Sequence, residues 1–208
     1  MTRLLLVRHG ATEFNSSLRF AGHSQIALSD LGSRQAVKLG RRLAGEKIDV
    51  VCTSDLRRAL DTAETACRGR DVEVLPCPEL REVDYGDCEG LTFEEIAARF
   101  PEVVEPWLGY SPDLTFSGGE SLAGFIERAG GFLDRLESNP QWRTVLVVSH
   151  GGVIRVLLCR LLGLSTDHWW QLRVDNASIS IVEASNQRAI LNLTNDTSHL
   201  AEGGDDDE

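Results

Sequence analysis

Two histidines in this chain of 208 residues stand in the same local setting, in which an apolar run is followed by histidine and then glycine. His9 lies in LLLVRHG and His150 in VLVVSHGG. Apolar runs of this length are typical of buried strands, so a titratable ring at the end of one indicates a site more than a core. Ligands bind at the carboxyl ends of strands in open α/β sheets, and glycine lets the backbone approach them closely. We therefore expect both histidines at one site.

Arginines accompany these strand ends. Arg8 directly precedes the first histidine, and Arg57 and Arg58 follow a second apolar run, VVCTS, where a helix is expected to begin. A helix start attracts anions through its free N–H groups and its dipole, so a cation there has the wrong sign unless an anion lies between them. Two guanidinium groups can grip phosphoryl oxygens in bidentate fashion. We expect Arg8 and Arg58 to bind phosphate and Arg57 to be a solvated surface residue.

The order of several blocks resembles a known family. RHGATEFN is similar to the RHGxTxxN signature of the histidine phosphatase superfamily, also called the phosphoglycerate mutase-like family. RFAGHSQIALSDLGSRQA, TSDLRRALDTAE, LREVDYGDCEG and SHGG resemble its later blocks in the same order. RHG alone would be a weak signal, but five ordered blocks covering residues 3 to about 200 are specific.

The resemblance implies roles for individual residues. His9 would be the nucleophile, Arg8, Arg58 and His150 would hold the phosphoryl group, and Glu82 would be the proton donor. A purely structural pairing of Glu82 with Arg81 or Arg58 is the alternative. Asn15 either binds the phosphate or holds its loop, and His23 lines the substrate entrance or lies on the surface. The expected substrate-binding residues are Thr12, Asn15, Ala21, Gly22 and Gly151.

The chemistry of these residues agrees with the resemblance. Histidine attacks phosphorus only through a neutral ring nitrogen, and nearby Arg8 and Arg58 should lower the pKa of His9. The attack gives a phosphohistidine, which splits one hard step into two. Glu82 would protonate the leaving alkoxide and then deprotonate the incoming water. We expect neither a metal nor another cofactor, because the arginines supply the positive charge.

Alternating strands and helices predict an α/β fold with a largely parallel central sheet. The resemblance implies that this sheet is flanked by helices in a three-layer sandwich like that of phosphoglycerate mutase. We expect one domain over residues 1–200 and a disordered acidic tail over 201–208. A loop is expected over residues 101–119, and capped helices are expected to start after Ser29, Ser54, Thr92 and Ser121. The expected strands are 3–8, 48–54, 143–150 and a terminal antiparallel hairpin of 177–184 and 188–194, with an extended segment over 72–80.

Charge and composition limit the partners. The net charge is −11, and it is still −6 without the five acidic residues of the tail. This acidity argues against nucleic acid or an anionic membrane as a partner, and no apolar stretch approaches the roughly 18 residues of a membrane span. Five cysteines without a Cys-x-x-Cys pair predict reduced thiols in a cytoplasmic protein and disfavour a zinc site. Trp169 and Trp170 mark either a homodimer face or, as we favour, packing on the sheet.

The favoured function is hydrolysis of a small-metabolite phosphate monoester. The alternatives are a phosphoglycerate mutase, a broad-specificity phosphatase and a non-catalytic phosphate-binding domain. The segment between Glu82 and His150 is short compared with that of the mutases, which favours water as the acceptor. FSGGESLAGFIERAGGFL resembles a Gly-Gly-Glu-Ser stretch of the α-ribazole phosphatases. We therefore take α-ribazole 5′-phosphate as the leading candidate substrate.

Overall fold

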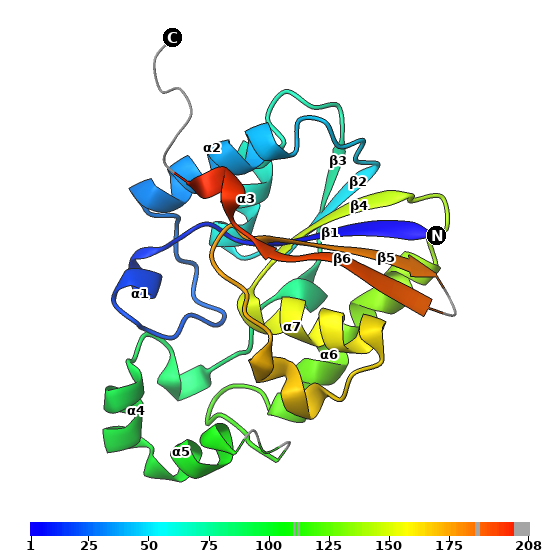
Figure 1. Ribbon diagram of the computed structural model, residues 1–208. Helices are drawn as coiled ribbons and strands as arrows, with labels where there is room; N and C mark the ends of the chain where they lie inside the picture. The colour runs from blue at the N-terminus through cyan, green and yellow to red at the C-terminus, as the bar shows by residue number, and fades with distance from the viewer. Residues whose placement is uncertain (110, 112, 186–187, 202–208) are drawn as a thin grey trace.

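A six-stranded sheet forms the centre of the molecule in the computed structural model, which describes residues 1–109, 111, 113–185 and 188–201 (Figure 1). Its order is β3-β2-β4-β1-β5-β6. The expected disorder of the acidic tail concerns residues that, from 202 onward, lie outside this description. The strands are β1 (Thr2–Arg8), β2 (Val50–Thr53), β3 (Glu73–Pro76), β4 (Thr144–Ser149), β5 (Ile179–Ser185) and β6 (Arg188–Asp196).

The four strands β3, β2, β4 and β1 run parallel, and β5 and β6 add an antiparallel hairpin at the edge of the sheet. In the pairing of β1 with β4, Arg8 lies opposite Ser149. The residues that follow these two partners therefore leave the sheet at the same level. The largely parallel sheet and the terminal hairpin confirm the sequence prediction.

Both faces of the sheet are covered by helices. Along β1, Leu4 and Leu6 belong to the larger apolar core and Leu5 and Val7 to the smaller one, as the alternation of side chains in a strand requires. The smaller core packs under α2 and α3, and the larger one packs under α6 and α7, which lie on the opposite side of the sheet (Figure 1). The expected three-layer architecture is thereby confirmed.

Most helix starts follow the expected caps. Ser29 and Ser121 each accept a backbone N–H with the side-chain oxygen, and Thr92 and Glu95 form a capping box. The α-helices are α1 (Glu13–Ser16), α2 (Asp30–Arg42), α3 (Arg57–Ala66), α4 (Phe93–Arg99), α5 (Pro101–Leu108), α6 (Leu122–Glu137) and α7 (Gly151–Leu162). The 3₁₀ turns are η1 (Pro78–Leu80), η2 (Gly86–Cys88), η3 (Thr166–Gln171) and η4 (Ser198–Leu200).

Two local predictions were wrong. The segment 101–119 was expected to be a loop, but α5 occupies its first part because Pro101 stands at the first helical position, where its missing N–H costs nothing. Trp107 of this helix packs against Tyr85 and Phe20. Ser54 was expected to cap α3, but the cap position is Leu56, without a side-chain hydrogen bond. The Ser54 hydroxyl is used elsewhere, as described below.

The helices α1, α4 and α5 lie beyond the carboxyl end of β1, away from the N-terminus of the chain (Figure 1). Trp169 packs against the larger core, whereas Trp170 is 45% exposed. Within the described part of the chain, no helix is both long and apolar enough to cross a membrane. Short helices and loops therefore cover the carboxyl end of the sheet, where the two histidines lie.

Candidate active site

His9 and His150 meet because they follow paired positions of neighbouring parallel strands. The backbone N–H of His9 donates to the carbonyl of Ser149 at 2.9 Å, which extends the ladder of β1 and β4 by one residue. The ring centroids of the two histidines are 5.1 Å apart, and both side chains are buried. The structure brings the two histidines together at the same end of the sheet, and their shared role in one site stays a prediction.

The ring of His9 is held in one orientation. Its Nδ1 lies 2.7 Å from the carbonyl oxygen of Gly10. A carbonyl only accepts, so Nδ1 carries the proton and Nε2 of the neutral ring keeps a free lone pair. Burial, and then the charges of Arg58 and Arg8, hold the pKa of His9 well below 6.5. The ring is therefore neutral at neutral pH, as a nucleophile must be.

His150 is held by the residue that was expected to cap a helix. Its Nε2 lies 2.8 Å from the Ser54 hydroxyl, which also accepts the backbone N–H of Leu56. Among the described residues this ring is the only acceptor within hydrogen-bond distance of the hydroxyl proton, so we assign the proton of the neutral imidazole to Nδ1. Burial and the charge of Arg58 hold the pKa of His150 well below 6.5. Its Nδ1 is buried without a hydrogen-bond partner in the described chain.

Arg58 is fully buried at the start of α3. Its Nη1 donates to the carbonyl of Ser24, and its Nη2 donates to those of Ala21 and Gly22, at 2.8–3.0 Å. Burial lowers the pKa of Arg58 to about 10, so the guanidinium is still charged at neutral pH. Its Nε has no partner among the described residues. By contrast, Arg57 is exposed and pairs with Asp61, as predicted for a surface residue.

Arg8, like Arg58, donates to a backbone carbonyl and keeps a buried nitrogen without a partner. Its Nη1 donates to the carbonyl of Val174 at 2.8 Å, while its buried Nε has no partner within the described residues. Burial is the main cause that lowers the pKa of Arg8, and the nearby Glu82 acts in the opposite direction. Buried polar groups in folded proteins nearly always have partners. Three orphaned nitrogens, on Arg8, Arg58 and His150, therefore indicate that this site is built to receive an acceptor-rich ligand.

Glu82 faces the start of α7. Its two carboxylate oxygens accept the backbone N–H groups of Gly152 at 3.1 Å and Val83 at 3.2 Å. A Cβ placed on Gly152 would lie 2.3 Å from a Glu82 oxygen, which explains why glycine occupies that position. His23 lies beside the backbone of Glu82, since its Nε2 is 3.1 Å from the Glu82 carbonyl oxygen, and its Nδ1 is 3.4 Å from the Asp84 carboxylate.

Two expected binding residues organise the loop after β1. Thr12 and Asn15 form a capping box for α1, in which the side-chain oxygen of Asn15 accepts the N–H of Thr12 at 2.9 Å. Asn176 donates both to this oxygen, at 3.1 Å, and to the carbonyl of His9, at 3.2 Å. Of the two roles considered for Asn15, the contacts show that of holding the loop.

Ala21 and Gly22 contribute backbone carbonyls to Arg58, so they position a cation in this structure. Their loop is fixed by Glu89, whose carboxylate accepts the N–H groups of Gly22 and His23 and the hydroxyl of Ser24. Gly151, the fifth expected residue, begins α7 and lines the cavity described next.

A cavity of about 520 Å³ opens at this end of the sheet. It brings together six of the expected residues, Arg8, His9, Asn15, Ala21, Glu82 and Gly151. Arg58 and His150 lie deeper, buried behind this surface. Sequence reasoning did not assign Tyr85, Arg155, Trp169 and Asn176 to the site, although all four also line the cavity.

A metal site is a separate question. Across residues 1–109, 111, 113–185 and 188–201, no group of three or more histidine, cysteine, aspartate and glutamate side chains could hold a metal ion. The five cysteines are free and buried, and all lie away from the cavity lining. The positive charge available here comes from guanidinium groups.

Comparisons with known proteins agree with this geometry. Residues 4–197 match the family model described as the histidine phosphatase superfamily (branch 1). The chain is 35% identical over 202 residues to phosphoserine phosphatase 1 of Hydrogenobacter thermophilus, covering 97% of this chain and 96% of that protein. It is 33% identical to the metal-independent phosphoserine phosphatase of Arabidopsis thaliana, covering 98% and 85%. The crystal structure of the α-ribazole phosphatase of Shigella flexneri superposes with a TM-score of 0.89 at 31% identity, covering 94% and 96%.

Proposed function

Because the chain belongs to the histidine phosphatase superfamily, we propose that it hydrolyses a small-metabolite phosphate monoester through a phosphohistidine on His9. The family, the fold and the enzyme class expected from the sequence are thereby confirmed. The observation that carries the proposed mechanism is the set of three buried nitrogens without partners in the described chain, on Arg8, Arg58 and His150, around a neutral imidazole.

In the first step, Nε2 of His9 attacks phosphorus. The bond between phosphorus and the ester oxygen breaks, and Glu82 gives a proton to the leaving alkoxide. Arg8, Arg58 and the Nδ1 proton of His150 stabilise the charge on the phosphoryl oxygens. These donors are already in place and already desolvated, so they need little reorganisation as the charge develops.

In the second step, Glu82 takes a proton from water. The resulting oxygen attacks the phosphorus of the phosphohistidine, the P–N bond breaks, and the His9 lone pair is restored as inorganic phosphate leaves. The arginines supply the positive charge throughout, so we propose that no metal is needed. EDTA should leave the activity intact, and inhibition that is reversed by added metal would refute this part of the proposal.

The relatives support two classes of substrate. Two of those described above are named phosphoserine phosphatases, and one is named an α-ribazole phosphatase. The phosphoglycerate mutase alternative has no support from these names. A broad-specificity phosphatase would accept all such esters, because the arginines contact only the phosphate that they share.

A substrate panel tests the proposal. O-phosphoserine, α-ribazole 5′-phosphate and 3-phosphoglycerate should be assayed for release of inorganic phosphate, and 3-phosphoglycerate also for conversion to the 2-isomer. We expect phosphate release from at least one ester and at least a roughly 10⁴-fold loss of kcat in His9→Ala. Isomerisation faster than phosphate release would make the chain a mutase, and retained activity in His9→Ala would refute the phosphohistidine.

Two coarser expectations belong with this proposal. We infer a cytoplasmic location from the five free and buried cysteines, since oxidising compartments favour disulfides. A homodimer is a further proposal, and the exposed Trp170 would lie in its interface. Size-exclusion chromatography with light scattering would decide the second point.

A further inference from the structure

Arg155 is the cation in the cavity that the phosphate site does not use. It lies on α7 one turn after Gly151, and it lines the cavity together with Trp169 and Tyr85. Its Nε donates to the carbonyl of Leu172 at 2.7 Å. Its two Nη nitrogens make no hydrogen bond or ion pair with any described residue.

The other arginines that line the cavity in the described chain each use a terminal nitrogen in a hydrogen bond or an ion pair. Arg19 forms an ion pair with Glu95 at 2.7 Å and also donates to the carbonyl of Gly90. Arg8 donates to a backbone carbonyl and has one orphaned nitrogen for the phosphate. Among the arginines that line the cavity in the described chain, Arg155 alone has both terminal nitrogens unused.

The charge of Arg155 lies close enough to Arg8 for the two guanidinium groups to repel each other. After burial and the opposing effect of Glu82, the charge of Arg155 is the next contribution to the pKa of Arg8, and it acts to lower it. Two like charges at one cavity repel each other, and only an anion between or beside them compensates for this. Glu82 lines the same cavity and offsets part of this repulsion, but Arg155 forms no ion pair with a described residue, so a phosphate monoester held by Arg8 and Arg58 would still leave its two Nη nitrogens without a partner.

We propose that Arg155 binds a second anionic group, a carboxylate on the leaving group of the substrate. This inference rests on the proposed function and narrows its substrate class to phosphorylated hydroxy acids and amino acids. A guanidinium with two free terminal nitrogens can bind a carboxylate in bidentate fashion, and the Leu172 carbonyl fixes the plane of the group. It favours acidic esters over α-ribazole 5′-phosphate, whose leaving group carries no carboxylate.

Matched substrates isolate the carboxylate. O-phosphoserine and O-phosphoethanolamine differ only in that group, so the ratio of their kcat/KM values measures its recognition. We expect the wild-type enzyme to prefer O-phosphoserine by roughly 10- to 100-fold, which is the value of a charged hydrogen-bonded contact. Arg155→Ala should bring the ratio close to one, mainly through the KM of O-phosphoserine, and Arg155→Lys should retain part of the preference.

The control variant is Arg160→Ala, which removes an exposed arginine of the same helix outside the cavity lining. It should keep the wild-type ratio. Equal losses for both substrates in Arg155→Ala would show that Arg155 serves the phosphate or the fold, and would overturn the inference. A wild-type ratio near one would also overturn it.

The inference and the proposed function can fail separately. Hydrolysis of p-nitrophenyl phosphate by the wild-type enzyme without any preference for the acidic ester would leave the phosphatase standing and remove the carboxylate site. If no ester is hydrolysed, calorimetric titration of the wild-type protein with both ligands gives the same ratio as an affinity. A tenfold tighter binding of O-phosphoserine that is lost in Arg155→Ala and partly retained in Arg155→Lys would still support the carboxylate site, and equal affinities would refute it.

Discussion

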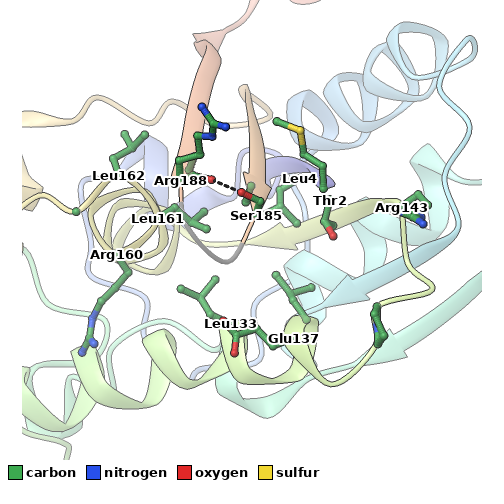
Figure 2. Close-up of a pocket in the computed structure, with 16 residues that line it drawn as sticks. Thr2, Leu4, Leu133, Glu137, Arg143, Arg160, Leu161, Leu162, Ser185 and Arg188 are labelled. Atoms are coloured by element: carbon green, nitrogen blue, oxygen red, sulfur yellow. Dashed lines mark hydrogen bonds between the residues drawn. The ribbon is translucent and has the colours of Figure 1, made fainter.

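The two ends of the central sheet each carry a cavity and arginines, but the arginines differ in how far they are exposed to solvent. The cavity at the amino end is the larger, at about 730 Å³ against about 520 Å³. Its arginines, Arg143, Arg160 and Arg188, are all exposed. Figure 2 shows the side chains of Arg160 and Arg188 pointing away from each other, while Leu4, Leu133 and Leu161 surround the hollow. At the carboxyl end, Arg58 is fully buried, and its Nε has no partner among the described residues.

The comparison indicates that, for anion binding, the desolvation of the arginines matters more than the size of the cavity or the number of its charges. An exposed guanidinium is hydrated, and its attraction for an anion is screened by water and salt. A buried one has lost its water, so a missing partner is costly until a ligand supplies it. We therefore propose that the smaller cavity is the phosphate site and that the larger one is a surface hollow lined in part by leucines.

The largest effect expected in the variants that test this contrast is that of His150→Ala. It removes a buried donor that is already aimed at the site, and kcat should fall roughly 10²- to 10³-fold. The matched control is His168→Ala, an exposed histidine of η3, which should keep wild-type kcat. Steady-state kinetics with O-phosphoserine measures both. A loss below threefold in His150→Ala, with the protein still folded, would assign His150 to the structure alone.

Substitution of two glycines separates the effect of displacing Glu82 from a general effect on stability. Gly152→Ala would place a methyl group 2.3 Å from a Glu82 oxygen, and the displaced carboxylate should lower kcat roughly 10- to 100-fold. Gly131→Ala lies in α6 with nothing within 4 Å of the new carbon, so it should raise the free energy of unfolding by about 1 kcal/mol or less and leave kcat alone. Equal kinetic effects of the two substitutions would contradict the placement of Glu82.

The buried histidines also make stability depend on pH. The pKa values of His9 and His150 are lowered, mainly by burial, so the unfolded state binds more protons below pH 6.5 than the folded state does. The stabilising contribution is therefore complete above pH 6.5 and is lost as the pH falls. Urea denaturation should show the free energy of unfolding decreasing by up to about 1.4 kcal/mol per pH unit for each histidine. His150→Gln should flatten this dependence, and an unchanged slope would contradict it.

The smallest effect is expected at the amino end of the sheet. Reversal of charge in Arg160→Glu and Arg188→Glu should change kcat/KM for O-phosphoserine less than twofold, since exposed charges at this distance are screened. Activity measured at 50 and 150 mM salt would check this. A tenfold change would mean that the larger cavity communicates with the site.

The sequence was sufficient where function depends on a strand end or a helix start. The strand-histidine-glycine pattern located His9 and His150, and the position of Arg58 in the first turn of α3 followed from the strand before it. Residues supplied by tertiary contacts could not be found in this way. Asn176 contacts the loop after β1 from a position 167 residues beyond His9, and no local pattern distinguishes it.

The errors have a related physical origin. Ser54 has the sequence of a helix cap, but its hydroxyl bonds a histidine 96 residues away, which local propensity does not describe. Pro101 ends one helix and also starts the next, and the tertiary packing of Trp107 against Tyr85 and Phe20, which helps to hold the second helix, could not be read from the local sequence. No sequence motif indicated Arg155, because its proposed role depends on terminal nitrogens that have no partner among the described residues.

The most direct test of the account is to trap the covalent intermediate. The enzyme should be mixed with O-[³²P]phosphoserine for milliseconds, quenched in base and digested, and the labelled peptide sequenced by mass spectrometry. We predict an acid-labile, base-stable phosphoryl group on Nε2 of His9, with none in His9→Ala and with a wild-type amount in His168→Ala. Steady-state turnover without a labelled histidine, or a label on another residue, would contradict the central claim that His9 is the nucleophile.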